Sequence, residues 1–343
     1  METDSFDFKI PKRLIAQKPI TPRDSARLLY VGNKLKDLNV QDLPKFIKKG
    51  DILVLNDTKV IPARFLGQRG EASIEVTLHK SNDNGTWSAF ARPARRLREG
   101  NIIKISSNFS AEVVKKLEGG EFILQFTVAS LERALQKHGF MPLPPYIKRA
   151  KKGHPADLEM YQTIYARHMG AFAAPTAGLH FTKSLLTAIA TGGAKIVYLT
   201  LNVGAGTFLP VKVKHIANHK MHAEWGQITS KTANDINTVR KNGGKVIACG
   251  TTVLRLLESA TDENGTLQPY EGETNKFIRP GYQFRIVDRL MTNFHMPRTT
   301  LFMLVSAFSG LEKMKSAYTH AIKAGYRFYS YGDACFLDRN LSS

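Results

Sequence analysis

The chain has 343 residues, of which 43% are hydrophobic and 23% are charged, values close to the averages of folded proteins that exclude wholesale disorder. Its 49 lysines and arginines outnumber 29 aspartates and glutamates, which gives a formal net charge of +20. The longest apolar run, residues 301–308, is too short to cross a bilayer, and residues 1–13 lack the apolar stretch of a secretory signal. We therefore expect a cytoplasmic protein that has no membrane partner.

The basic composition favours a polyanion as partner, because a surface that binds phosphate groups releases their condensed counterions. Solubility alone is the other explanation of the net charge. The two cysteines, Cys249 and Cys335, are expected to be buried thiols in a reducing compartment.

The first strong strand signal is residues 51–55 (DILVL), which are followed by the polar pair Asp57 and Thr58. The same pattern of an apolar strand and a small polar turn recurs at residues 195–201 and 245–249. Ligands of α/β folds bind beyond the carboxyl ends of such strands, where small residues let the backbone approach the ligand. A single turn of this kind would be an ordinary connection, but three of them favour a binding site.

Residues 62–145 interrupt this pattern with short alternating runs, turns and few helix signals, which predict a small antiparallel β-barrel. The runs are residues 73–79, 86–90, 101–105, 112–117 and 121–127. We therefore predict a large α/β domain of residues 1–60 and 150–343, with a layered or distorted, barrel-like sheet and helices. A small antiparallel β-barrel domain of residues 61–149 interrupts it.

Basic residues concentrate in the predicted barrel and at its exit. Arginines at a connection between strands are suited to binding phosphates, and a tyrosine can stack on a base. A solvated charged loop is the alternative. The candidate RNA-binding residues are Arg92, Arg95, Arg96, Arg98, Tyr146, Lys148 and Arg149.

Residues 173–182 (AAPTAGLHFT) have neither a helix period nor a strand period. Pro175, Thr176 and Gly178 predict a stiff turn that directs His180 toward a bound small molecule. A buried, hydrogen-bonded core histidine is the alternative for His180.

Helices are predicted to begin at threonines after these turns, so that strand and helix alternate as an α/β fold requires. The dipole of a helix that begins after Thr182 favours a carboxylate at its N-terminus. The predicted caps are Thr182 for a helix that runs to residue 189, Thr251 or Thr252 for a second helix, and Thr299 or Thr300 for a third that ends before Gly310.

Two further turns carry candidate binding groups. Gly204, Gly206 and Thr207 resemble a phosphate cradle but complete no nucleotide-binding motif. Asn293 and His295 precede a predicted helix, whose N-terminus favours an anion. His295 is expected to be either a site residue or a core histidine.

Three histidines, His215, His219 and His222, are spaced four and three residues apart and would share one face of a helix. Zinc binding is one interpretation of this spacing. The segment lacks an HExxH pattern and a nearby cysteine, so we expect no metal and interpret His222 and Glu224 as a substrate-binding or acid–base pair.

Ten segments, in order over nearly the whole chain, resemble the S-adenosylmethionine:tRNA ribosyltransferase-isomerases of queuosine biosynthesis. They are RDSARLL (23–29), GDILVLNDTKVIPAR (50–64), PLPPYIKR (142–149), YQTIYA (161–166), AAPTAGLHFT (173–182), VGAGTF (203–208), HKMHAE (219–224), GTTVLRLLES (250–259), FIRPGYQFRIVDRLMTNFHMP (277–297) and YRFYSYGDA (326–334).

The resemblance implies an enzyme that attaches the ribosyl part of S-adenosylmethionine to 7-aminomethyl-7-deazaguanine at the wobble position of a tRNA anticodon. Epoxyqueuosine in tRNA, adenine and methionine are the implied products, and the family needs no metal. The implied partner is a tRNA anticodon stem-loop, and we expect the protein to be a monomer. The sequence departs from the family at Asn202, where histidine is common, and at Ala171 and Phe172, where Ser-Val is commoner.

Within this resemblance we expect His180 and Glu224, together with His222, to act as base and acid–base partner. The residues expected to hold S-adenosylmethionine are Asp57, Thr58, Thr176, Gly178, Gly204, Gly206, Thr207, Thr251, Thr252, Asn293 and His295. Charge and barrel alone would equally fit a non-catalytic tRNA-binding module, and the three histidines would fit a metal-dependent hydrolase.

Overall fold

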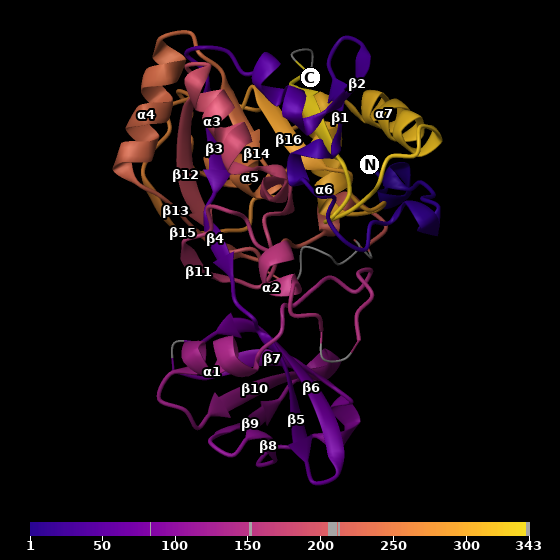
Figure 1. Ribbon diagram of the computed structural model, residues 1–343, viewed down its shortest axis with the longest axis vertical. Coiled ribbons are helices and arrows are strands. Elements are labelled where there is room, and N and C mark those ends of the chain that lie inside the picture. The colour runs from indigo at the N-terminus through magenta and orange to yellow at the C-terminus, as the bar shows by residue number, and fades with distance from the viewer. Residues whose placement is uncertain (83, 151–152, 205–210, 212, 341–343) are drawn as a thin grey trace. The chain divides into compact units, whose positions relative to one another are not determined.

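The computed structural model describes residues 1–82, 84–150, 153–204, 211 and 213–340 (Figure 1). The chain forms two compact units. The first contains Met1–Thr58, Thr163–His168 and Pro175–Ser343, and the second contains Lys59–Gln162 and Met169–Ala174. Residues 150–162, which the sequence-based division places in the α/β domain, therefore lie in the second unit.

The first unit is built on a mixed sheet, nine strands wide in the described part of the chain. Its four middle strands, β12, β3, β14 and β16, run parallel to one another, and they include the three strands predicted from sequence. The order across the sheet is β15 (Tyr270–Thr274), β13 (Glu224–Ile228), β12 (Lys195–Leu201), β3 (Ile52–Asn56), β14 (Val246–Cys249), β16 (Arg289–Asn293), β17 (Ala334–Asp338), β1 (Arg27–Val31) and β2 (Leu35–Asn39).

Five α-helices accompany this sheet in the described residues, and α5 packs against β3, β12 and β14. They are α3 (Lys183–Thr191), α4 (Ser230–Lys241), α5 (Thr251–Ala260), α6 (Thr300–Ser309) and α7 (Leu311–Lys323). Short 3₁₀ helices are η1 (Thr3–Phe6), η2 (Lys12–Leu14), η3 (Arg23–Ser25), η4 (Val40–Lys45), η7 (Thr176–His180) and η9 (Ile216–Asn218). Every helix in the described residues is too short or too polar to cross a bilayer.

Two of the predicted helix caps are confirmed. The hydroxyl of Thr182 accepts a hydrogen bond from the Leu185 amide (3.1 Å), and that of Thr299 accepts one from the Phe302 amide (3.4 Å). The second of the predicted helices, α5, begins at Thr251 as expected, but Gly250 is its N-cap residue and no side chain caps it. Gly250 has φ +95°, a left-handed conformation that favours glycine, and it turns the chain from β14 directly into α5.

The core of the first unit surrounds β3, whose five residues are all buried. Leu53 and Leu55 pack with Leu185 and Ile189 of α3 in one apolar cluster. A strand buried on both faces reads as a continuous apolar run, which is why DILVL was recognisable.

The second unit is a closed antiparallel β-barrel with the strand order β10-β7-β6-β5-β8-β9. Phe65, Phe109 and Phe122 fill its interior. The strands are β5 (Arg64–Arg69), β6 (Ala72–Ser81), β7 (Trp87–Arg92), β8 (Ile102–Ser106), β9 (Phe109–Lys116) and β10 (Glu121–Phe126). The unit also contains η5 (Ala94–Arg96), η6 (Glu118–Gly120), α1 (Leu131–His138) and α2 (Asp157–Met160).

The predicted fold class, an α/β domain interrupted by a small antiparallel barrel, is confirmed. The five predicted barrel strands correspond to β6 to β10, and β5 was missed. Gly67 breaks the alternation of β5 because a Cβ at that position would collide with the Ile103 side chain. A two-stranded sheet of β4 (Thr58–Val60) and β11 (His168–Ala171) lies where the chain passes between the units.

Candidate active site

The carboxyl ends of β12, β3, β14 and β16 lie at one edge of the sheet, because these neighbouring strands are parallel. This edge brings together candidate residues that the sequence places far apart. They are Asp57 and Thr58 after β3, Gly204 after β12, Thr251 and Thr252 after β14, and Asn293 and His295 at the end of β16.

A polar network connects η7 to β16 at this edge. The Thr176 hydroxyl donates to Oδ1 of Asn293 (2.9 Å), so the amide nitrogen of Asn293 faces Nε2 of His180 at 3.2 Å. An amide nitrogen only donates, and Nε2 of His180 therefore accepts this hydrogen bond. His180 is thus bonded within the protein, as the buried-histidine alternative expects.

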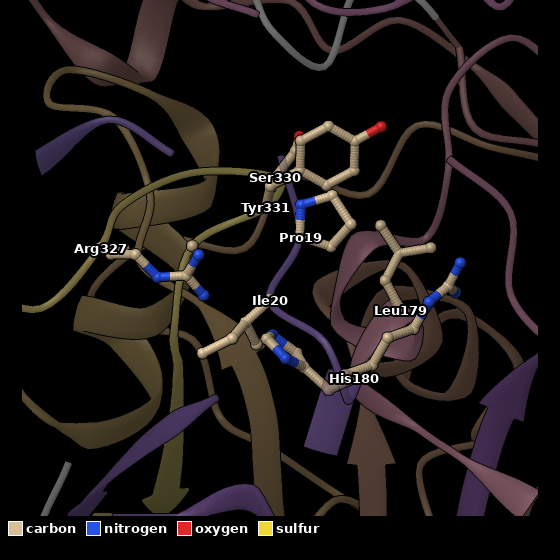
Figure 2. A pocket seen from close by; sticks show the side chains of 9 residues that line it. Pro19, Ile20, Leu179, His180, Arg327, Ser330 and Tyr331 are labelled. Atoms are coloured by element: carbon tan, nitrogen blue, oxygen red, sulfur yellow. The ribbon is translucent and has the colours of Figure 1, made fainter. Parts of the chain in front are cut away.

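Burial, together with the nearby guanidinium charges of Arg327 and Arg23, lowers the pKa of His180 to about 4, while a hydrogen bond with the Arg23 backbone opposes this change. The imidazole is therefore neutral at physiological pH. It lines a small pocket with both arginines, and Figure 2 shows the Arg327 guanidinium extended toward Ile20 and His180. The arginines make the surroundings of His180 electropositive.

Gly178 is required by close packing in η7. A Cβ at this position would collide with the hydroxyl of Tyr165 and would lie 2.9 Å from the methyl carbon of Thr163. The glycine in AAPTAGLHFT therefore lets η7 pack against residues 163–165.

The N-terminus of α3 holds a carboxylate of the chain itself. Thr182 donates a hydrogen bond from its hydroxyl to Oδ2 of Asp24 (2.6 Å), and Gln41 donates to the other oxygen of Asp24 (3.3 Å). This arrangement argues against the expectation that a substrate carboxylate binds at Thr182.

Asp57 is a buried carboxylate at the end of β3. Its Oδ1 accepts a hydrogen bond from the Thr200 hydroxyl (2.7 Å), and Nε2 of the exposed His168 lies 3.6 Å from Oδ2. Burial raises the pKa of Asp57, although the hydrogen bond from Thr200 and the charge of His168 oppose this change. A raised pKa makes a carboxylate a stronger base than an ordinary aspartate.

Thr58 and Asn202 form a pair beside Asp57. The Thr58 hydroxyl donates to Oδ1 of Asn202 (2.8 Å) and lies 3.4 Å from the His168 carbonyl. Asn202 is therefore a hydrogen-bond acceptor for Thr58.

Glu224, at the start of β13, forms a buried ion pair. Its Oε2 accepts a hydrogen bond from the Arg255 guanidinium (2.5 Å), and its Oε1 accepts one from the Gly204 amide (2.8 Å). Both carboxylate oxygens are occupied, so Glu224 fixes the backbone just after β12. Gly206 and Thr207 lie outside the described residues.

The face that His215, His219 and His222 would share if this segment were a helix does not form. His215 precedes the three-residue helix η9, His219 is extended, and His222 is exposed in the segment before β13. His219 packs its ring against Phe277 at 5.4 Å, and burial together with His222 lowers its pKa. Among the described residues no group of three or more histidine, cysteine, aspartate or glutamate side chains is placed to hold a metal ion.

His295, Thr251 and Thr252 are buried at the edge of the sheet. Nε2 of His295 lies 3.1 Å from the Thr292 hydroxyl, and burial lowers the pKa of His295 to about 3. Within the described part of the chain, Nδ1 of His295 and the Thr252 hydroxyl have no hydrogen-bond partner. These two atoms are the buried polar groups at this edge that a ligand could satisfy.

The candidate RNA-binding residues all lie in the second unit. Arg92, Arg95, Arg96 and Arg98 are exposed, as is Lys148, whereas Tyr146 is half-buried. The Arg149 guanidinium instead makes 3.0 Å hydrogen bonds to the buried carboxylate of Asp157. Arg149 is therefore engaged in holding residues 149–157 together.

Sequence reasoning missed Arg255, Arg23 and Arg327. Arg255 had a usable signal, because it lies among apolar residues on the buried side of α5, where a charge needs a partner. Arg23 and Arg327 had no such signal, because only the fold brings them to His180.

Comparison with known proteins identifies the family. The family model described as "Queuosine biosynthesis protein" matches residues 3–337. The chain is 55% identical to the S-adenosylmethionine:tRNA ribosyltransferase-isomerase of Rhodospirillum rubrum over 98% of each chain. It is also 55% identical to that of Parvibaculum lavamentivorans, over 98% of this chain and 99% of the relative.

A solved structure agrees with these relatives. The S-adenosylmethionine tRNA ribosyltransferase of Thermotoga maritima is 32% identical and has a TM-score of 0.56, with 97% of this chain and 99% of that chain covered. The protein is therefore an enzyme that belongs to the queuosine biosynthesis family of S-adenosylmethionine:tRNA ribosyltransferase-isomerases.

Proposed function

We propose that this enzyme transfers the ribosyl part of S-adenosylmethionine to the aminomethyl group of 7-aminomethyl-7-deazaguanine in the wobble position of tRNA, and isomerises it. The products are epoxyqueuosine in tRNA, adenine and methionine. The observation that carries this proposal is the 55% identity to ribosyltransferase-isomerases over 98% of the chain.

The chemistry of the donor explains what the protein must supply. A sulfonium makes the neighbouring C5′ hydrogens of ribose acidic, and loss of one as a proton gives an ylide. Opening of the ribose ring then expels adenine and leaves a vinyl sulfonium, which the substrate amine attacks. Closure of the epoxide then breaks the bond to sulfur and releases methionine. The enzyme therefore needs a base, a proton donor for adenine and a site that excludes water.

Asp57 is the base in this proposal. It is buried at the carboxyl end of β3, is held by Thr200, and has a raised pKa. These properties favour proton transfer near neutral pH over a purely structural ion pair.

His180 was one of the residues expected from sequence to act as the base or as its acid–base partner, and its environment makes it a weak base. Its pKa is about 4, and its Nε2 already accepts a hydrogen bond from Asn293. Proton removal by His180 would require Asn293 to move first. We therefore assign the neutral imidazole, with Asn293 and Thr176, to substrate binding.

Glu224 acts as a positioning residue in this proposal, because its carboxylate is bonded to Arg255 and Gly204. The acid–base role of His222 stays a prediction. Direct contacts to S-adenosylmethionine are assigned to the other candidates at the edge of the sheet, namely Thr58, Gly178, Gly204, Thr251, Thr252 and His295. No metal takes part in the proposed reaction.

The test is an assay of adenine release by purified enzyme with S-adenosylmethionine and tRNA that carries the deazaguanine precursor. We expect adenine and a ribosyl-modified tRNA nucleoside in equal amounts, and no adenine with tRNA that carries guanine at that position. Adenine release without modification of the nucleoside would refute the proposed transfer.

A further inference from the structure

An aromatic stack lies on the outside of the barrel. Phe90 of β7 is 44% exposed, whereas its neighbours Ala89 and Ala91 are buried in the barrel interior. The Phe90 ring stacks on the imidazole of His79, with ring centroids 4.6 Å apart and planes at 26°. A large apolar ring is thus held against a second ring and remains accessible to solvent.

The partner ring is largely buried and lies beside a carboxylate. The side chain of His79 is only 18% exposed, and its Nε2 lies 3.1 Å from Oε1 of Glu121. Glu121 is directly opposite Phe90 in the β7–β10 pairing. The stack is therefore preorganised, which reduces the conformational entropy lost when a ligand binds to it.

Exposed arginines continue from this ring along the chain. Arg92 points to the same side of β7 as Phe90, two residues further on and about 7 Å away along the strand. Arg95 and Arg96 of η5 and then Arg98 follow it, and all four are exposed. No ion pair between described residues neutralises these guanidinium groups.

An accessible ring beside free guanidinium groups has the chemistry of a single-stranded RNA site. Any of the four RNA bases can stack on the ring, and arginines neutralise the neighbouring phosphates. A paired base within a helix offers no free face, so the ligand must be an unpaired nucleotide. The net charge of +20 favours RNA over a protein partner for this surface.

We propose that Phe90, supported by His79, stacks on an unpaired nucleobase of the tRNA substrate, and that Arg92 and the arginines after it bind the adjacent phosphates. This inference rests on the proposed function, because it takes tRNA as the RNA that is bound. It adds Phe90 and His79 to the RNA-binding residues expected from sequence, which include neither ring.

The test measures the Kd of the full-length enzyme for precursor tRNA at several salt concentrations. Phe90→Leu keeps an apolar side chain but removes the ring, and we expect Kd to rise about five- to tenfold with an unchanged salt slope. Arg92→Gln is expected to weaken binding and to reduce the slope of log K against log salt by about one. Ile102→Ala and Val114→Ala, which truncate apolar side chains of the same barrel that are 54% and 47% exposed, are the matched controls and should bind as wild type does.

A second variant tests the stacking contact without relying on a loss of tRNA affinity. Phe90→Trp should retain the wild-type Kd, and tRNA should quench its fluorescence beyond any change in the wild-type protein. Wild-type affinity of Phe90→Leu, or a Phe90→Trp signal that tRNA leaves unchanged, overturns the stacking proposal. Neither result touches the proposed function, which fails only if the wild-type enzyme does not modify the precursor tRNA.

Discussion

His180 should make the stability of the first unit depend on pH. Its pKa falls from 6.5 to about 4 on folding, mainly through burial and also through the charges of Arg327 and Arg23. Between these two pH values the unfolded chain binds a proton that the folded protein excludes, so the free energy of unfolding falls as pH falls. Each tenfold change in proton affinity is worth about 1.4 kcal/mol, and the loss between pH 6.5 and 4 is therefore ~3 kcal/mol.

The perturbation is His180→Gln, which removes the titrating group and keeps a side chain able to bond with Asn293. The variant is expected to lose ~3 kcal/mol less stability than the wild type between pH 7 and pH 4. The comparison uses the change in the free energy of unfolding with pH in each protein. Any packing cost of the substitution is the same at every pH and therefore cancels. His295 and the carboxylates contribute equally to both proteins.

The assay is urea unfolding at pH 7, 6, 5 and 4, followed by tryptophan fluorescence. The chain has two tryptophans, Trp87 in the barrel unit and Trp225 in the same unit as His180. A Trp87→Phe background therefore reports the unfolding of the relevant unit alone. If His180→Gln loses stability with pH as steeply as the wild type does, the imidazole is not held neutral in the folded protein and the reasoning is refuted.

Three further predictions concern the edge of the sheet and α3. Asp57→Asn should lower the rate of adenine release at least about 100-fold. The free energy of unfolding at pH 7 should not fall, because burial disfavours the charged form of the carboxylate that is removed. Retained activity would exclude Asp57 as the base. Glu224→Gln should lower the free energy of unfolding in urea by about 3–5 kcal/mol, because it leaves the Arg255 guanidinium buried without a counter-charge. The double variant with Arg255→Met should regain most of that free energy. Thr182→Ala should cost about 0.5–2 kcal/mol through loss of the α3 cap, and Thr182→Ser should keep most of that stability.

Much of the fold followed from local patterns. The apolar runs at β3, β12 and β14 and the alternation in β6 to β10 are signals that lie within a few residues of one another. The strand β5 was not predicted because the packing of Gly67 against Ile103 interrupts the alternation of apolar and polar side chains. The α5 cap was misassigned because the left-handed conformation of Gly250 makes the turn that a threonine was expected to make.

The edge of the sheet that carries the candidate site could be predicted from the sequence. The hydrogen-bond partners of the site residues could not. Parallel strands bring their carboxyl ends together, and this placed Asp57 and Thr251 at one edge from sequence alone. The strand β16 that brings Asn293 to the same edge was not predicted. The bond between His180 and Asn293 joins residues 113 positions apart, and no local signal selects one partner over another at that separation.

The face that the three histidines would share is absent for a related reason. Spacing implies a shared face only if the segment is helical, and a helix in a protein depends largely on packing of an apolar face. Of the described residues from His215 to Ala223, Ile216 alone is buried, so the segment has too little apolar surface to stabilise more than one 3₁₀ turn.

The insertion of the barrel after β3 constrains the order in which the chain assembles. The parallel partners of β3 begin at Lys195 and Val246, so this central strand emerges from the ribosome long before either can pair with it. The Ile61 amide donates to the Ala171 carbonyl (2.9 Å), so the two ends of the inserted chain lie close together in the folded second unit. Early formation of the barrel thus shortens the effective loop between β3 and β12 and lowers the entropy lost on closing it, so the insert favours the folding of its host.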